Sequence, residues 1–306
     1  MDYLFLILGF ALLIGSGNYL VKSASDIANH FNISKMVIGL LVVSFGTSAP
    51  ELLVSLQAAF KGMPEMALGN VIGSNIANIA LVLGLTAIIF PIIVKSKTIL
   101  WDWGLMFFAS LLLYLFIHDN FLASYEGIIF LAILASYILF TIKQNKIPKN
   151  EISNKKSNLW IASLLLVGSM FGMYYGSDFL VDSASKIAKN WGVSEKVISV
   201  TIIAFGTSVP ELATSVIAAF KKEMDISIGN IIGSNIFNIL SILGITVLVH
   251  PIKLNATALN IDMYWMLGIA AALLLSILPL KRGKIGRING LLFVCIYMMY
   301  IFLQFN

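Results

Sequence analysis

Charged residues are scarce in this sequence. Asp, Glu, Lys and Arg make up 11% of the 306 residues, whereas a soluble globular domain carries about 25%. Apolar residues account for 59% of the chain, and the mean hydropathy is +0.93. They form runs of about 20 residues, the length that a helix needs to cross a bilayer. The composition excludes an ordinary soluble protein and predicts a polytopic α-helical membrane protein.

Cysteine and histidine are nearly absent. The one cysteine, Cys295, lies in an apolar run, so it is expected to be inert packing and to form no intrachain disulfide. The histidines lie at the ends of predicted spans, where an interfacial role is expected; they are His30, His118 and His250. A zinc or copper site is therefore not indicated. No nucleophile–base pair or metal triad is evident, so we expect a protein that is not an enzyme and has no cofactor.

Two other interpretations of the composition are not favoured. The first apolar segment runs from Tyr3 to about Val21, which is too long for the core of a cleavable signal peptide. The net charge of +5 does not indicate a nucleic-acid partner, because the Lys and Arg residues lie in short loops, where they set membrane topology. The lipid bilayer and transported ions are the expected partners, and no obligate protein partner is indicated.

Two peptides occur twice, the second time 160 positions later. Gly46–Leu52 (GTSAPEL) returns as Gly206–Leu212 (GTSVPEL), and Gly69–Asn78 (GNVIGSNIAN) returns as Gly229–Asn238 (GNIIGSNIFN). Each copy places a glutamate, hydroxyls and amides inside an apolar stretch. Because such groups are costly in a bilayer, the duplication predicts a path for a polar substrate.

The apolar segments predict ten transmembrane helices. Their approximate bounds are 3–28, 36–60, 66–92, 99–118, 124–142, 158–185, 196–220, 226–250, 262–280 and 286–304. A lysine-rich linker at 143–157 separates a first five-helix repeat, 1–142, from a second, 158–306. Because five is odd, the second repeat must be inverted in the membrane relative to the first.

The basic residues indicate an orientation. With both termini outside the cell, 15 of the 20 Lys and Arg residues fall in cytoplasmic loops, including the linker, and 5 fall in outside loops. This bias follows the positive-inside rule. We therefore expect a multi-pass protein of the cell membrane with extracytoplasmic termini.

A break is expected in the second and seventh helices. Pro50 has no N–H for the carbonyl of Gly46, and Pro210 has none for that of Gly206. Discontinuous helices inside a membrane are tolerated only beside protein or a wet cavity. Glu51 follows Thr47 by one turn and shares its face, and Glu211 follows Thr207 in the same way.

The third and eighth helices carry matching polar stripes spaced four residues apart. These stripes are Asn70, Ser74 and Asn78 in the first repeat and Asn230, Ser234 and Asn238 in the second. Glycines in a small-xxx-small pattern accompany each stripe and favour close helix packing. Glu51 and Asn78 fall near the middle of their spans, so the broken and polar helices are expected to meet at the membrane midplane.

Carboxylate, hydroxyl, amide and carbonyl oxygens would surround that meeting point. Such a set suits a hard cation, since Ca²⁺ takes about 6–8 oxygen ligands in a flexible shell. Asp178 and Asp182, near the outer end of the sixth span, are expected to be ordinary solvated charges, with an acidic vestibule as the alternative.

On these residues the sequence resembles the sodium/calcium exchanger family of the cation/calcium exchanger superfamily, in its compact prokaryotic form. The resemblance covers both halves and rests on GTS(A/V)PEL and GN(V/I)IGSNI. It implies electrogenic exchange of several Na⁺ for one Ca²⁺. The family's central ion site would map onto Thr47, Ser48, Glu51, Ser74, Asn78, Thr207, Ser208, Glu211, Ser234 and Asn238, with backbone carbonyls at Ser44 and Ala204 helping to hold Na⁺.

One departure from the family pattern concerns charge. Some relatives and the potassium-dependent branch carry Asp where this chain has Asn238. The site would then hold two formal negative charges, from Glu51 and Glu211, which is enough to neutralise one Ca²⁺. Potassium coupling becomes less favoured.

Two other transport modes stay open at this point. A proton/calcium antiporter would use the same glutamates as proton carriers, and a pH gradient alone would drive Ca²⁺ uptake. A passive cation channel would need no counter-ion. The long first and sixth spans, which the resemblance suggests as gating elements, contain no carboxylate at the midplane.

Overall fold

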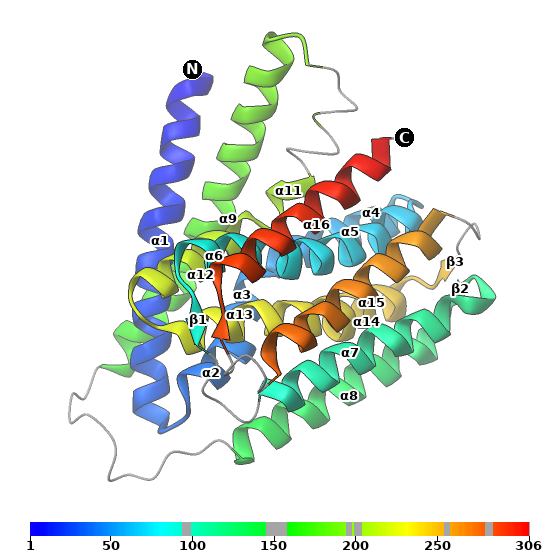
Figure 1. The fold of residues 1–306 in the computed structure, drawn as a ribbon, viewed down its shortest axis with the longest axis horizontal. Helices are drawn as coiled ribbons and strands as arrows, with labels where there is room; N and C mark the ends of the chain where they lie inside the picture. The colour runs from blue at the N-terminus through cyan, green and yellow to red at the C-terminus, as the bar shows by residue number, and fades with distance from the viewer. Residues whose placement is uncertain are drawn as a thin grey trace.

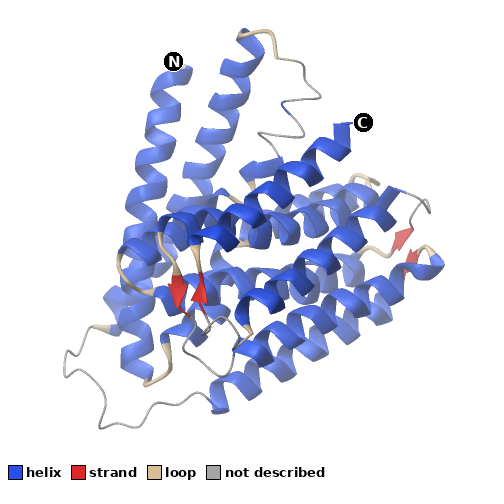
Figure 2. Ribbon diagram, viewed as in Figure 1, coloured by secondary structure: helices blue, strands red, loops and turns tan. Residues whose placement is uncertain are grey.

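A computed structural model describes residues 1–93, 99–144, 158–193, 198, 204–253, 258–278 and 284–305. Helices dominate this part of the chain, and the strands are two residues long (Figure 2). In the first half the helices are α1 (Asp2–Phe31), α2 (Lys35–Ile38), η1 (Gly39–Val43), α3 (Ser44–Thr47), α4 (Ala49–Phe60), α5 (Pro64–Ala77), η2 (Asn78–Leu83), α6 (Gly84–Ile89), α7 (Ile99–Phe116), η3 (Ile117–Asp119) and α8 (Ser124–Gln144). In the second half they are α9 (Leu159–Asn190), α11 (Ala204–Gly206), α12 (Val209–Phe220), α13 (Met224–Phe237), η6 (Asn238–Leu243), α14 (Gly244–Val249), α15 (Ala258–Ile277) and α16 (Arg287–Phe305). The strands are β1 (Ile92–Ile93), β2 (Phe121–Leu122), β3 (Ile252–Lys253) and β4 (Lys284–Ile285).

Seven of the described helices are long and apolar enough to cross a membrane. The bent pair Lys35–Thr47 and Ala49–Phe60 makes an eighth span if it is counted as one, and Val209–Phe220 and Ile261–Ile277 are shorter apolar helices. The prediction of a multi-pass helical membrane protein is confirmed. The count of ten stays a prediction, because part of the seventh predicted span, and the linker 145–157, lie outside the described residues.

The two halves contact each other reciprocally. Helix α8 of the first half packs against α14 and η6 of the second half. In the same manner, α16 of the second half packs against α6 and η2 of the first (Figure 1). The short strands also pair between the halves: β1 pairs antiparallel with β4, and β2 pairs antiparallel with β3. The halves are therefore interlocked rather than placed side by side.

Glycines allow the closest of these approaches. A methyl group built on Gly290 of α16 would lie 2.6 Å from the carbonyl oxygen of Gly84, and one built on Gly127 of α8 would lie 2.7 Å from that of Gly244. Real carbon–oxygen contacts are longer, so a larger side chain would push these helices apart. The corresponding positions in the two repeats thus serve the same packing contact.

The small-xxx-small glycines of the second repeat also face backbone. A methyl group on Gly229 of α13 would lie 2.6 Å from the carbonyl oxygen of Met36, and Gly233 lies against Leu40 of η1. The stretch equivalent to residues 36–40 in the second half lies almost wholly outside the described residues.

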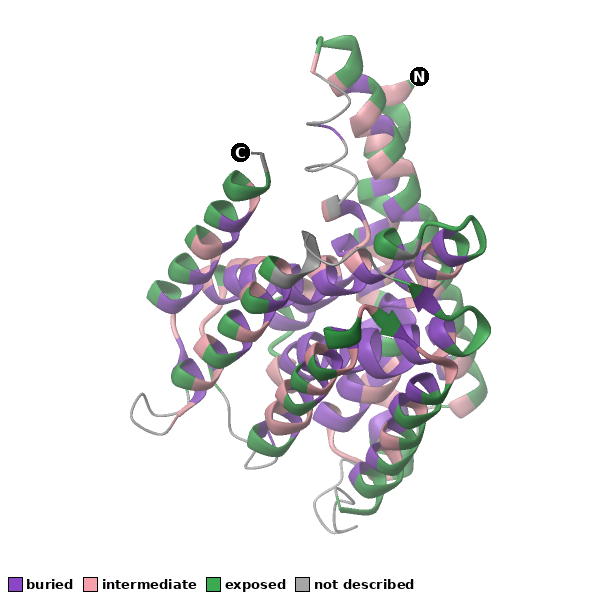
Figure 3. Cartoon of the chain, turned by 90° about the vertical axis from the view of Figure 1, so that its right-hand side faces the viewer, coloured by how far each residue is buried: buried purple, intermediate pink, exposed green. Residues whose placement is uncertain are grey.

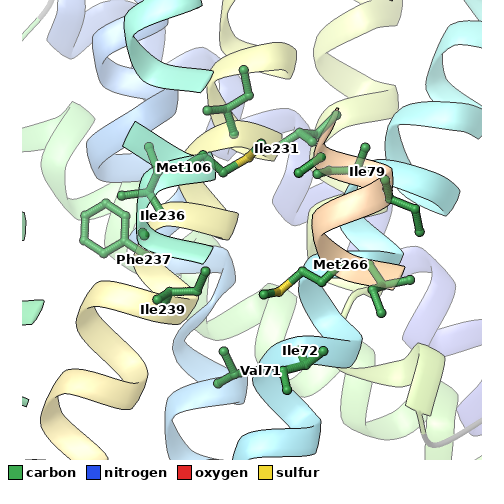
Figure 4. Packing of buried hydrophobic residues seen from close by; sticks show 14 of the residues in the cluster. Val71, Ile72, Ile79, Met106, Ile231, Ile236, Phe237, Ile239 and Met266 are labelled. Carbon is green, nitrogen blue, oxygen red and sulfur yellow. The ribbon is translucent and has the colours of Figure 1, made fainter. Parts of the chain in front are cut away.

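Burial separates inner helices from outer ones. In the most apolar 18 residues of Met224–Val249, 89% of the residues are buried, whereas in those of α1 the share is 28%. Figure 3 shows buried positions gathered in the centre and exposed positions on the outer helices. Apolar side chains from both halves fill this centre, among them Ile72, Ile79, Ile231 and Ile236 (Figure 4).

The long helices α1 and α9 form a separate pair. They pack along each other and project beyond the rest of the bundle (Figure 1). A methyl group on Gly9 would lie 2.9 Å from the carbonyl oxygen of Gly176, so their backbones nearly touch.

Candidate cation-binding site

Each motif with the sequence GTSxPE contains a non-helical residue. Ser48 separates α3 from α4 with φ −87° and ψ 6°, and the helical stretches Lys35–Thr47 and Ala49–Phe60 are bent by 44°. Thr207 and Ser208 separate α11 from α12, and Ser208 has φ −86° and ψ 2°. Pro50 and Pro210 are each the second residue of the new helix, where the missing N–H costs no helical hydrogen bond. The breaks therefore lie between Gly46 and Pro50 and between Gly206 and Pro210.

The two glutamates follow directly after the breaks. Glu51 and Glu211 lie in the first turns of α4 and α12, and both are 0% exposed. Glu211 accepts a hydrogen bond on Oε1 from Ser48 Oγ of the other half at 3.1 Å and a longer one from Ser234 at 3.5 Å. Neither Oε of Glu51 nor Oε2 of Glu211 has a hydrogen-bond partner within the described part of the chain. Three buried carboxyl oxygens are thus left with unused acceptor capacity.

The first asparagine of each polar stripe supports the neighbouring helix. Asn70 Nδ2 donates to the backbone carbonyl of Glu51 at 3.2 Å and to Ser55 Oγ at 3.0 Å. Asn230 Nδ2 donates to the carbonyl of Glu211 at 3.4 Å and to Ser215 Oγ at 3.1 Å. These equivalent bonds fix each glutamate's backbone. Thr47 Oγ1 adds a bond of 3.1 Å to Asn230 Oδ1 across the halves.

The last asparagines of the stripes are equivalent in sequence but not in contacts. Asn238 Nδ2 donates to Asn75 Oδ1 at 3.0 Å, and the Oδ1 of Asn238 has no partner among the described residues. Asn78 is completely buried, and neither of its side-chain polar atoms has a partner there.

Asn75 is the residue that sequence analysis missed. Its Nδ2 donates to the carbonyl of Asn235 at 3.3 Å while its Oδ1 holds Asn238. Its counterpart, Asn235, instead donates to Ile231 within its own helix at 2.8 Å. Both lie inside the repeated GNxIGSNI sequence, which gives no signal that they behave differently.

The remaining predicted residues are placed as follows. Ser44 is buried and its Oγ donates to the carbonyl of Leu40. Ser74 is buried, and the hydroxyls of Thr207 and Ser208 make no hydrogen bond within the described residues. Ala204 begins α11, and only its backbone is described. Among the described residues no three His, Cys, Asp or Glu side chains cluster, so any cation here would be held by a mixed set of oxygens.

Helix geometry changes at the site. Asn78 and Asn238 begin the π-helical segments η2 and η6, and η1 ends directly before Ser44. Short π-helical segments are rare and are found frequently at functional sites. Sequence analysis did not predict them.

One side of the site adjoins a cavity. About 240 Å³ of space lies between α4 and α9, lined by Pro50, Gly206 and Thr207 of the two motifs and by Tyr174 and Asp178 of α9. Asp182 instead pairs with Lys186 on the exposed surface at 2.6 Å, as expected for a solvated charge.

The contact between α12 and α1 is equivalent to the one between α4 and α9, and it is tighter. A methyl group on Gly17 of α1 would overlap Ile217 of α12. Lys221 Nζ, at the end of α12, donates to the carbonyl of Asn18 of α1 at 2.8 Å. The two faces of the site are therefore packed differently against α1 and α9.

Comparison with known proteins agrees with this architecture. The sequence profile of the family described as "Sodium/calcium exchanger protein" matches residues 1–143 and 161–306. The chain is 40% identical over 99% of its length to the CaxA protein of Alkalimonas amylolytica, provisionally named an antiporter and matched over 98% of its own length. It is 29% identical over its whole length to the sodium/calcium exchanger MaX1 of Methanosarcina acetivorans, of which 99% is covered.

A solved structure is similar over nearly the entire fold. The sodium–calcium exchanger NCX_Mj, in crystals soaked without Na⁺ and Ca²⁺, matches with a TM-score of 0.84 and 35% identity, covering 98% of this chain and 97% of the other. With the profile matching both halves, this chain belongs to the sodium/calcium exchanger protein family of membrane transporters.

Proposed function

We propose that the chain is an antiporter that exchanges several Na⁺ ions for one Ca²⁺ at the site between the two broken helices. The observation that carries the proposal is the pair of fully buried glutamates with unpartnered oxygens, one from each half. An uncompensated buried charge is costly, and a bound cation removes that cost. Hard cations prefer carboxylate, amide and hydroxyl oxygens.

Two carboxylates match the charge of one Ca²⁺. Glu51 and Glu211 would hold the ion, with Asn78 and Asn238 offering amide oxygens and Thr47, Ser48, Thr207, Ser208, Ser74 and Ser234 offering hydroxyls. Carbonyls at Ser44 and Ala204 would serve Na⁺. When Na⁺ replaces Ca²⁺, the same charge has to be balanced by more than one ion, which supports coupling of several Na⁺ to one Ca²⁺.

Alternating access is the proposed mechanism. The cavity between α4 and α9 supports access from one side, while the contacts of α1 with Ile217 and Lys221 support closure at the other. Two inverted repeats, 1–142 and 158–306, would allow the roles of α1 and α9 to exchange. The reciprocal pairing of β1 with β4 and β2 with β3 supports this relation.

Ionised glutamates without a cation at the midplane would cost several kcal/mol. A carrier that has released its ions should therefore be slow to reorient. That property would favour exchange over leak.

The decisive experiment is ⁴⁵Ca²⁺ uptake into proteoliposomes. Vesicles loaded with Na⁺ are diluted into buffer free of Na⁺ and K⁺, with a proton ionophore present. We expect uptake that requires internal Na⁺ and is abolished when choline replaces it. Uptake driven by a pH gradient without Na⁺ would identify a proton/calcium antiporter instead, and uptake that follows voltage alone would identify a channel.

The membrane orientation is proposed separately. The bias of basic residues supports a cell-membrane protein with extracytoplasmic termini and a cytoplasmic linker at 143–157. In cells of a variant lacking Cys295, an impermeant maleimide should label Asp2→Cys from outside but not Gln144→Cys. The reverse pattern would overturn the orientation without affecting the ion site.

A further inference from the structure

Helices α7 and α8 of the first half (Figure 1) border a cavity of about 630 Å³ outside the ion site. Several of its wall residues are exposed on the outer surface of the bundle, including Trp101, Ile129 and Phe140. Leu105 and Ile133 add to the apolar wall, while Asp102 and Tyr137 also line it. The cavity is thus an apolar groove toward the lipid that contains one carboxyl group.

The carboxyl group of Asp102 is buried and only partly satisfied. The residue is 3% exposed, and its Oδ1 accepts a hydrogen bond from Tyr137 Oη at 2.7 Å. Its Oδ2 has no hydrogen-bond partner within the described part of the chain. A buried acceptor without a donor destabilises a protein, so a ligand that brings a donor would be favoured here.

The second half provides an internal comparison. With the offset of 160 positions, Asp262 corresponds to Asp102. The strand pairing makes Ile285 equivalent to Leu122, so the offset is 163 for α8 and α16, and Gln304 corresponds to Thr141. Gln304 Nε2 donates to Asp262 Oδ1 at 2.6 Å, so that carboxyl is paired within the protein. The corresponding cavity between α15 and α16, of about 470 Å³, has no carboxyl group among its described lining residues.

One larger side chain distinguishes the second half. Trp265 stands where the first half has Leu105, whereas Ile296 matches Ile133 and Phe293 matches Phe130. The Trp265 ring packs against Tyr300 at 5.8 Å between centroids. The open groove with a spare acceptor is therefore a feature of the first half.

The position of the groove matches that of a phospholipid headgroup. Asp102 lies one turn from the start of α7, and the cavity reaches Gln144, the last residue of α8. Trp101 is 73% exposed and lies beside Phe140, with 6.4 Å between ring centroids. Aromatic rings of this kind are enriched at membrane–water interfaces, and Lys143 is exposed on the same end of α8.

We propose that this groove binds a phospholipid with a primary ammonium headgroup, namely an ethanolamine lipid. The ammonium would donate to Asp102 beside the face of Trp101. Lys143 would neutralise the phosphate, and an acyl chain would lie along Leu105, Ile129 and Ile133. The proposal uses no residue of the ion site, so it stands or fails independently of the transport function.

Native mass spectrometry of the purified full-length protein tests the proposal. The protein is incubated with an equimolar mixture of palmitoyl-oleoyl phosphatidylethanolamine, phosphatidylcholine and phosphatidylglycerol. The ethanolamine lipid should be retained roughly tenfold more than the choline lipid, whose quaternary ammonium has no N–H; tenfold corresponds to about one charge-assisted hydrogen bond. Equal retention, or preference for phosphatidylglycerol, would overturn the proposal.

Variants locate the binding. Asp102→Asn should remove the preference for ethanolamine over choline, whereas the matched change Asp262→Asn in the second half should leave it intact. Leu105→Trp, which copies the second half, should reduce retention at this site of every lipid while keeping the carboxyl group. Unchanged ethanolamine preference in a monodisperse Asp102→Asn protein, or unchanged retention in Leu105→Trp, would contradict the assignment.

A competition assay separates the headgroup from the chain. Dodecylammonium should displace the ethanolamine lipid, because it combines an ammonium with an apolar tail. Free ethanolamine at the same concentration should not. Displacement by free ethanolamine alone would contradict the role proposed for the apolar wall.

Discussion

Single residues with matching local sequences have different surroundings in the two halves. Glu211 accepts hydrogen bonds from Ser48 and Ser234, whereas both Oε atoms of Glu51 lack a partner in the described chain. Glu51 is therefore the carboxylate with more free acceptor capacity. A cation in the proposed site would gain more new carboxylate contacts from Glu51 than from Glu211.

Substituting either glutamate by glutamine should strongly impair Ca²⁺ exchange. Removing one of two negative charges weakens attraction for a divalent ion by more than about 1.4 kcal/mol, which is at least a tenfold loss. Uptake of ⁴⁵Ca²⁺ by Glu51→Gln and Glu211→Gln proteoliposomes measures this. Glu65→Gln, at an exposed position of α5, is the control, and near-normal exchange in both site variants would sink the assignment.

Asn75 should act by orienting Asn238. Asn75→Ala removes the acceptor that holds Asn238 Nδ2, and one hydrogen bond is worth about 0.5–1.5 kcal/mol. We expect the Ca²⁺ concentration for half-maximal exchange to rise about threefold to tenfold. Asn235→Ala should change it little, because that side chain bonds only within its own helix in the described structure. Equal effects of the two variants would argue for a purely structural role.

Much of the site follows from the sequence at this scale. Prolines two residues after Ser48 and Ser208 predict the helix breaks. The repeated polar stripe predicts which helices lie next to these breaks. The different bonds of Asn75 and Asn235 have no sequence signal, because identical local sequences acquire different neighbours only when the two halves pack.

Whole elements show where close packing fixes the geometry of the site. Gly229 places α13 against the backbone of Met36, and Gly233 places it against η1, just before Ser44. These contacts hold the first half's broken helix next to the second half's polar stripe. The glycine pattern predicted close packing, but not which helix would be the partner.

Gly229→Ala should therefore lower stability. Its added methyl group would meet the Met36 carbonyl at 2.6 Å, and overpacking typically costs about 1–3 kcal/mol. Gly168→Ala is the matched control, since a methyl group there meets nothing within 4 Å in the described structure. Thermal unfolding in detergent should show a lower midpoint only for Gly229→Ala; a fall of the same size in both would remove the packing explanation.

The π-helical segments were not predicted at the element scale. η2 and η6 begin at Asn78 and Asn238 inside runs that resemble ordinary apolar helix. An extra residue in a helical turn depends on what packs around it, and hydrophobic periodicity is too coarse to register it. The two-residue strands were missed for a similar reason, because their pairing partners are more than 120 residues away in sequence.

At the scale of the molecule, α1 and α9 form a unit that the proposed mechanism moves against the core. A cleavable bis-maleimide joining Asn18→Cys to Lys221→Cys, in a protein with Cys295→Ser, should stop exchange, because it ties α1 to α12. Cleaving the linker should restore it.

The control for this crosslink joins Phe5→Cys to Phe179→Cys. These rings lie 5.6 Å apart within the α1–α9 pair, so the crosslink leaves that unit free to move as a whole. Exchange should continue. Full activity in a verified Asn18–Lys221 crosslink would exclude motion of α1 against the core.

The interlocked halves also have a consequence for biogenesis. Helix α8 ends at Gln144, but its packing partner α14 begins only at Gly244. When the first five predicted spans have left the ribosome, α14 has not yet been synthesised. The face of α8 that will contact α14 therefore remains exposed to lipid. The transporter therefore reaches its final packing only near the end of translation, so a chain truncated before Gly244 would be a target for membrane quality control rather than half of a working protein.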